Sequence, residues 1–189
     1  MFKKMLAVMA LMIAGTTAMA EDRLTLGVRH DDFVGSNRSQ QAFVVNYDHR
    51  MNDKLQVGLG LRLIERNSYD KNNNRLTNRY MLRVNYELTD LIYINSAVGS
   101  KNQSLAKSTE FWQTEVGVKY RLNDTWQVRA GYAYREGFNG KADDYYEGPR
   151  VGVQYRINPR YNLNVQYDMY KFLNEDRNRI NINIQKRLF

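Results

Sequence analysis

The stretch VKYRLNDTWQVRAGY, residues 118–132, places an apolar or aromatic side chain at nearly every second position, with Lys, Arg or Gln between them. A short polar segment, LND, interrupts the alternation. Alternation with a period of two on both sides of an Asn-Asp turn predicts a β-hairpin.

The same pattern occurs three more times, which makes it a repeated supersecondary unit. The copies are VNYDHRMNDKLQVGLGL from Val45, VNYELTDLIYINSAVG from Val84 and VQYRINPRYNLNVQY from Val153, and the end of the chain, IQKRLF from Ile184, is a truncated fifth copy. Polar stretches rich in Gly, Asn, Ser and Asp separate the hairpins and predict loops. The ten strands expected are 23–32, 41–50, 54–66, 78–88, 91–100, 111–122, 125–136, 149–157, 160–172 and 178–188.

Short turns therefore alternate with mostly longer loops along an even number of strands of about ten residues. This arrangement is typical of bacterial outer-membrane barrels, whose short turns and long loops lie at opposite ends. The sequence predicts an all-β fold, an antiparallel up-and-down transmembrane β-barrel of about ten strands, in the outer membrane of a Gram-negative cell. Both ends of the barrel chain are expected on the short-turn side.

The first twenty residues, MFKKMLAVMALMIAGTTAMA, have a different character. Two lysines precede an apolar run, and Ala18 and Ala20 occupy the small-residue positions before Glu21, so residues 1–20 are predicted to be a signal peptide and residues 21–189 the barrel. The apolar run is shorter than the roughly 20 residues that a membrane-spanning helix needs. The chain contains no cysteine, which excludes disulfides and thiolate metal sites.

One face of the predicted strands is apolar and carries no formal charge in the middle of any strand. A hairpin register with Tyr120 opposite Trp126 places Val118 opposite Val128; the equivalent pairs are Val84 with Ile94, Val45 with Leu59 and Val153 with Leu163. Alternation alone also fits a soluble barrel or sandwich that buries this face. Aromatic residues beside the tight turns favour a membrane boundary at one height; they are Tyr47, Tyr86, Tyr120, Trp126, Tyr155 and Tyr161.

The opposite face is strongly basic. Its cations are Arg29, Arg50, Arg62, Arg79, Arg83, Lys119, Arg121, Arg129, Arg135, Arg150, Arg156 and Arg187, against the acids Asp31, Asp48, Glu87, Glu115 and Asp168. Arg23, Lys54, Arg160 and Arg179 share this face but lie at the expected strand starts, so they are not counted here. A wall of one charge sign concentrates counter-ions, here anions, and guanidinium forks suit carboxylates. The candidate solute pathway consists of Arg29, Arg62, Arg79, Arg83, Lys119, Arg129, Arg135 and Arg150. Tyr93 and Tyr170 also point inward, where they could stack on sugar rings.

The same residues allow a second interpretation, a small structural or adhesive barrel whose lumen is filled by ion pairs. Glu115 with Arg129 and Asp168 with Arg150 are the pairs expected on the inner face. Ten strands lie between the filled eight-stranded barrels and the water-filled large porins, so strand number does not decide between the two.

A barrel enzyme is the third class, and the sequence gives it little support because a hydrolase needs an activated nucleophile and a base. The two histidines are His30, near the outer rim, and His49, expected at the turn end of the lipid face. A Ser36–His30–Asp32 group can be drawn, although these are nearby loop residues. An aspartate-based protease could use Asp31, Asp32, Asp143 and Asp144, but loop acids such as Asp143 and Asp144 are expected to be solvated. We expect no enzymatic activity, cofactor, metal site or nucleic-acid partner.

Two segments between Leu122 and Phe172, LNDTWQVRAGYAYR and YYEGPRVGVQYRINPRYNLNVQYDMYKF, resemble the KdgM-like porins, small monomeric channels for acidic oligosaccharides, and their sialic-acid relatives. The resemblance implies a monomeric channel in outer-membrane lipid for passive diffusion of small anionic solutes, acidic oligosaccharides in particular. Arg83, Arg129 and Arg150 would then be the arginine-track positions. Barrels of that family have twelve strands, so ten strands imply a narrower pore here.

Overall fold

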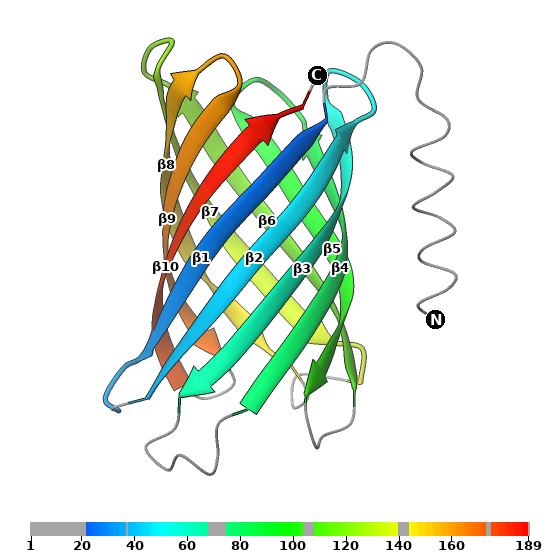
Figure 1. Ribbon diagram of the computed structural model, residues 1–189, viewed down its shortest axis with the longest axis vertical. Coiled ribbons are helices and arrows are strands. Elements are labelled where there is room, and N and C mark those ends of the chain that lie inside the picture. The colour runs from blue at the N-terminus through cyan, green and yellow to red at the C-terminus, as the bar shows by residue number, and fades with distance from the viewer. Residues whose placement is uncertain are drawn as a thin grey trace.

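The chain forms a single closed antiparallel barrel (Figure 1). Each strand pairs with its neighbours in sequence, and β1 pairs with β10 to close the barrel. The computed structural model describes residues 22–36, 38–67, 75–103, 108–139, 144–172 and 175–188, so the predicted signal peptide lies outside it. The strands are β1 (Arg23–Phe33), β2 (Ser39–Arg50), β3 (Leu55–Asn67), β4 (Arg75–Glu87), β5 (Ile92–Gln103), β6 (Thr109–Arg121), β7 (Trp126–Gly137), β8 (Tyr146–Asn158), β9 (Tyr161–Phe172) and β10 (Glu175–Arg187). This confirms the predicted fold class and the ten strands.

The two ends of the barrel differ as predicted. The short connections 51–54, 88–91, 122–125 and 159–160 lie at one end, together with the start of β1 and the end of β10 (top of Figure 1). We call this the turn end and the opposite end, which carries the longer connections, the loop end. Over the described residues, no helix is long and apolar enough to span a membrane.

The same pattern of side-chain-to-backbone hydrogen bonds occurs in all four tight turns. Asn123 Oδ1 accepts hydrogen bonds from the backbone amides of Thr125 and Trp126, both at 2.8 Å. The equivalent side-chain oxygen of Asn52, Thr89 or Asn158 accepts the corresponding two amides in each of the other turns. Polar side chains that satisfy the backbone two and three residues ahead stabilise turns of this kind.

These turns make the predicted hairpin register wrong by two residues. Tyr120 lies opposite Val128 rather than Trp126, and Val118 lies opposite Ala130. The other three hairpins shift by the same amount, with Tyr47 opposite Leu59, Tyr86 opposite Ile94 and Tyr155 opposite Leu163. The cause is the wider turn, in which the amide of Leu122 already bonds to the carbonyl of Trp126. A shift of two keeps every side chain on its predicted face.

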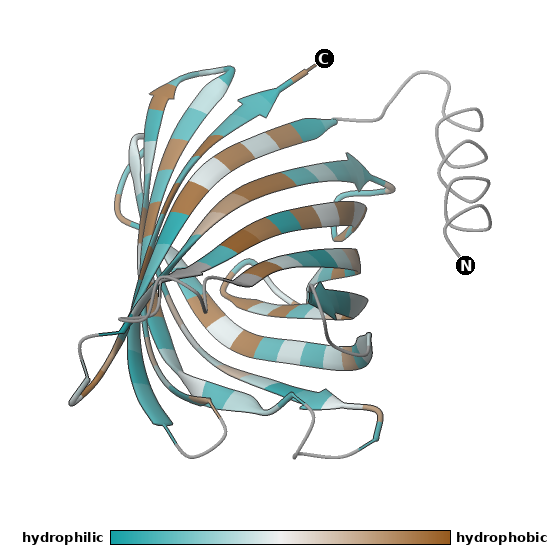
Figure 2. Cartoon of the chain, turned by 60° about the horizontal axis from the view of Figure 1, so that its bottom comes forward, coloured by the Kyte–Doolittle hydropathy of each residue, from teal (hydrophilic) through white to brown (hydrophobic). Residues whose placement is uncertain are grey.

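The outer surface is an apolar band. Val28, Val116 and Ile182 are each about half exposed although they lie in the middle of strands, and brown apolar stripes cross the strands in Figure 2. Exposed apolar side chains arranged around a closed barrel match a lipid-facing surface.

Aromatic residues border this band at both ends. At the turn end the rings of Trp126 and Tyr155 pack with centroids 4.7 Å apart. Toward the loop end, Trp112 packs on Tyr134 at 5.3 Å and Tyr134 on Tyr145 at 5.8 Å. Two aromatic girdles that flank an apolar band are a general feature of outer-membrane barrels. The sequence indicated the first girdle and missed the second.

Candidate functional site

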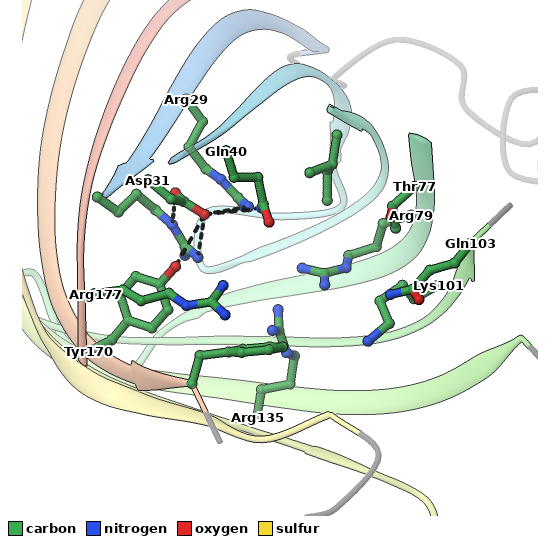
Figure 3. Close-up of a pocket in the computed structure, with 13 residues that line it drawn as sticks. Arg29, Asp31, Gln40, Thr77, Arg79, Lys101, Gln103, Arg135, Tyr170 and Arg177 are labelled. Atoms are coloured by element: carbon green, nitrogen blue, oxygen red, sulfur yellow. Dashed lines mark hydrogen bonds and ion pairs between the residues drawn. The ribbon is translucent and has the colours of Figure 1, made fainter. Parts of the chain in front are cut away.

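The lumen contains two cavities, which together hold most of the polar inward side chains. The larger, about 480 Å³, lies toward the turn end. The smaller, about 70 Å³, lies toward the loop end, and Figure 3 shows the residues that line it. Arg135 and Arg179 line both cavities and therefore mark the level at which one gives way to the other.

The eight candidate pathway residues all lie in the lumen. Arg29 and Arg79 line the smaller cavity, and Arg135 lines both. The other five line the larger cavity, namely Arg62, Arg83, Lys119, Arg129 and Arg150.

Further charged residues belong to the lumen although they were not among its candidates. Arg23 and Arg179 were assigned to the inward face but left out as residues at strand starts, and both line the larger cavity. Arg177 lies in β10, just before its expected start, and Lys101 lies in β5 rather than in a loop. Asp144 precedes β8 and is fully buried. The alternation that marked the other inward residues extends into these strand ends, and following it one residue further would have included Lys101 and Arg177.

A layer of paired charges lies on the inner wall of the adjacent strands β8, β9, β10 and β1, at the level where the two cavities meet. Arg179 Nε donates to Asp31 Oδ1 at 2.7 Å, and Arg29 Nη2 donates to Asp31 Oδ2 at 3.0 Å. Asp168 lies 3.4 Å from Arg179 and 3.5 Å from Arg150. Since Asp31 and Asp168 are fully buried, each carboxylate requires these cations to offset its desolvation. We call Asp31, Asp168, Arg29, Arg150 and Arg179 the ionic layer.

The predicted pair of Asp168 with Arg150 is therefore present, whereas the predicted pair of Glu115 with Arg129 is wrong. Glu115 instead pairs with Arg150 and accepts a hydrogen bond from Tyr93 Oη at 2.7 Å. Arg129 donates to Gln166 at 2.7 Å. The register shift is the reason, because it brings Ala133 rather than a residue nearer Arg129 opposite Glu115.

The two inward tyrosines are held within the protein. Tyr93 bonds to Glu115, and a Cβ on Gly117 would come within 2.5 Å of its hydroxyl, so glycine leaves the space that this ring occupies. Tyr170 donates to Asp31 at 3.1 Å and lies beneath the Arg179 guanidinium, 4.2 Å from its ring centroid. Both rings are more than nine-tenths buried, which contradicts the expectation that they present a free face for sugar stacking.

The larger cavity keeps a large excess of positive charge. Its lining includes twelve Arg or Lys side chains against the four acids Asp48, Glu87, Glu115 and Asp168. Each of the four acids has a cationic partner: Asp48 lies 3.3 Å from Arg83 and Glu87 lies 2.7 Å from Lys119, while Glu115 and Asp168 both contact Arg150. Arg129 contacts the neutral Gln166, and Arg62 Nε has no hydrogen-bond partner within the described part of the chain.

The position of Asp144 differs most from the prediction. It was expected to be a solvated loop acid, but its side chain is fully buried. Its carboxylate lies 2.9 Å from Arg135 and 3.7 Å from both Arg79 and Lys101. Burial alone would raise the pKa of Asp144, but the positive charges of Arg135, Arg79 and Lys101 lower it more, so the net pKa lies below the usual value. Asp143, the neighbouring loop acid, lies outside the described residues.

The histidines differ from the arrangement that a hydrolase would need. His30 contacts Asp32 at 2.8 Å on the exposed rim, as expected, whereas the Ser36 hydroxyl donates to the carbonyl of Phe33 and not to His30. His49 was expected to face lipid, yet its side chain is buried. Its Nδ1 atom lies 2.6 Å from Asp22 Oδ1. The proposed Ser36–His30–Asp32 group is therefore not formed.

Comparison with known families decides the class of protein. Residues 5–148, more than half of the chain, match the family described as outer membrane protein beta-barrel domain. The chain belongs to this family. Membership, together with the apolar band and its two girdles, places this barrel in the outer membrane.

Solved structures support the same fold for this outer-membrane family member. The translocator domain of the autotransporter NalP from Neisseria meningitidis is 8% identical, with 98% of this chain and 94% of that chain covered and a TM-score of 0.56. An outer membrane channel from Pseudomonas putida F1 is 10% identical, with 92% and 97% covered and a TM-score of 0.56. At these identities the similarity shows the fold alone.

The KdgM porin, whose family the sequence resembles, is 12% identical over 90% of this chain and 100% of that chain, with a TM-score of 0.48. A TM-score at this level does not separate KdgM-like barrels from other outer-membrane barrels. No curated protein sequence matches the chain.

Proposed function

We propose that this outer-membrane barrel is a channel for passive diffusion of small anionic solutes, acidic sugars among them, through its basic lumen. The observation that carries the proposal is the charge of the larger cavity, with twelve cationic side chains against four carboxylates. A positive wall within a low-dielectric barrel raises the local concentration of anions and repels cations.

The arrangement of these cations supports a pathway rather than a purely structural role. Arg129 is held by a neutral amide and Arg62 Nε has no partner in the described chain, so neither charge is neutralised by a carboxylate that contacts it. Cations that line a cavity without a contacting carboxylate attract counter-ions. Mobile anions passing through the lumen would supply them.

The ionic layer limits the size of the solute. Asp31, Asp168 and Arg179 are buried where the two cavities meet, and Arg135 lines both sides. Small anions are therefore the substrates that fit best. A longer acidic oligosaccharide, as the KdgM resemblance implies, could pass only if the layer opened.

The second candidate is a structural or adhesive barrel with a closed lumen, and the ionic layer is the observation that favours it. Its buried pairs join the adjacent strands β8, β9, β10 and β1 along one side of the barrel wall. Ion pairs of this kind can rigidify a barrel wall without conducting anything.

Solute uptake into proteoliposomes distinguishes the two functions. We expect glucuronate to enter faster than glucose, which is similar in size but uncharged. The substitutions Arg83→Glu and Arg129→Glu should reduce this preference, while Arg160→Glu, which makes the same charge change in an exposed turn, should leave it unchanged. Equal rates for the two sugars would contradict anion preference, and no uptake of either by inserted protein would support the closed barrel.

A further inference from the structure

We infer that the smaller cavity is a binding site for one divalent tetrahedral oxyanion, such as sulfate or hydrogen phosphate. The inference deepens the proposed function by naming a specific site within the anion pathway. It rests on four features of the cavity, which are its charge, its unpartnered donors, its size and the directions from which its donors come.

Six cationic side chains line this cavity, against the single carboxylate of Asp31. Four of these cations surround the central space in Figure 3, Arg29, Arg79, Lys101 and Arg177, and they come from β1, β4, β5 and β10. Among the described residues, the other carboxylates that contact the six are Asp144, Glu175 and Asp168, the last shared with Arg150. The cations outnumber these acids, so the cavity remains positive.

Several donors at the cavity have no partner within the described part of the chain. Arg29 and Arg79 are 3% and 4% exposed, and in each the Nε and Nη1 atoms are buried without a hydrogen bond. Arg177 Nε is unsatisfied as well. A buried guanidinium whose nitrogens lack acceptors is costly, and an anion that accepts hydrogen bonds from the same side chain offsets its charge.

Aromatic rings hold several of these cations in place. Arg177 lies between the rings of Phe33 and Phe172, at 3.8 Å and 4.1 Å from their centroids. Arg79 and Arg135 both lie over Phe111, at 5.1 Å and 5.3 Å. Cation–π contacts position a guanidinium without neutralising its charge, so the donors stay available to a ligand.

Size and direction define the ligand class. A cavity of about 70 Å³ can hold a small oxyanion, whereas a sugar ring with its hydroxyl groups fits only when the lining side chains move apart. Donors approach from opposite walls of the barrel, because β1 and β10 lie across the lumen from β4 and β5. A tetrahedral anion presents oxygens in all these directions, whereas a carboxylate presents two oxygens on one side only.

Isothermal titration of sodium sulfate into the full barrel in detergent, at constant ionic strength with chloride as the background anion, tests the site. We expect saturable binding of one sulfate per barrel. Arg79→Gln should weaken it by about tenfold or more, and Lys101→Gln should weaken it by a smaller factor. The matched control Arg160→Gln, in an exposed turn outside both cavities, should bind as the wild type does.

Absence of saturable sulfate binding would overturn the inference. Wild-type affinity in both Arg79→Gln and Lys101→Gln, with far-ultraviolet circular dichroism showing a folded barrel, would overturn it too. The measurement is independent of conduction, so a barrel that binds sulfate in detergent but passes no solute retains the site and loses only the channel function.

Discussion

Asp31 in β1 and Arg179 in β10 face each other in register across the seam where the first and last strands close the barrel, and Arg179 Nε donates to Asp31 Oδ1 at 2.7 Å. Both side chains are buried, and Arg29 and Tyr170 also bond to the same carboxylate. The residues that join the ends of the barrel chain are thus also the centre of the ionic layer in its lumen.

Asp31→Asn should destabilise the barrel strongly, because it leaves Arg179 and Arg29 buried with less compensating charge. We expect a loss of about 3–5 kcal/mol in the free energy of unfolding. Denaturant unfolding in detergent measures it. Asp32→Asn is the matched control, since Asp32 is exposed on the next position of the same strand and should change stability by less than about 0.5 kcal/mol. Equal effects of the two substitutions would contradict the structural role of the pair.

Asp144 should make part of the stability acid-sensitive. Its pKa is lowered in the folded barrel, so its contribution is fully present above the unfolded value of about 4 and is lost as the pH falls through the lower folded pKa. Asp144→Asn should therefore cost about 3 kcal/mol at neutral pH and progressively less at acidic pH. Unfolding curves recorded across the pH range measure this convergence. Asp124→Asn, in an exposed turn, should show no such cost. If the stability difference between Asp144→Asn and the wild type did not change with pH, the ion pairs of Asp144 would not be its source.

The lipid-facing assignment predicts depth-dependent costs for charge on the outer surface. Val116 is half exposed in the middle of β6, and Val116→Arg should destabilise the folded barrel by about 2–4 kcal/mol in a bilayer. Leu122→Arg, in the exposed turn that follows the same strand, should cost about 0–1 kcal/mol. Folding equilibria in lipid vesicles measure both values. Similar small costs at the two positions would show that the middle of the band does not contact hydrocarbon.

Removing the side-chain acceptor from one of the four tight turns should lower the stability of the barrel slightly. Asn123→Ala removes the acceptor of two backbone amides and should reduce stability by about 1 kcal/mol. Asp124→Ala in the same turn keeps those bonds and serves as the control. Thermal unfolding of the two variants in detergent compares them, and indistinguishable melting temperatures would mean that the side chain of Asn123 does not stabilise the turn.

The strands and their faces could be predicted from the sequence because alternation depends only on neighbouring residues. Val116 and Val118 keep their outward orientation whichever partner lies opposite them, so a register error of two residues left the face assignment intact. The register itself depends on hydrogen bonds within the turn, such as those to Asn123 Oδ1, and the alternation contains no information about them.

The ionic partners in the lumen depend on barrel closure and were harder to predict. Asp31 and Arg179 are far apart in sequence and meet only because β1 pairs with β10. Asp144 has the sequence surroundings of a solvated loop acid, and its burial follows from three cations on β4, β5 and β7 that face it in the closed barrel. Composition and alternation place residues on a face, but they do not show which inward charges contact each other.

The reversal potential of the purified protein in a planar lipid bilayer under a potassium chloride gradient tests the central claim most directly. A hydrated lumen with a cationic wall should conduct, and the sign of the potential should show selectivity for chloride. A potential that shows cation selectivity, or silent bilayers after insertion has been verified, would contradict an anion pathway through this barrel.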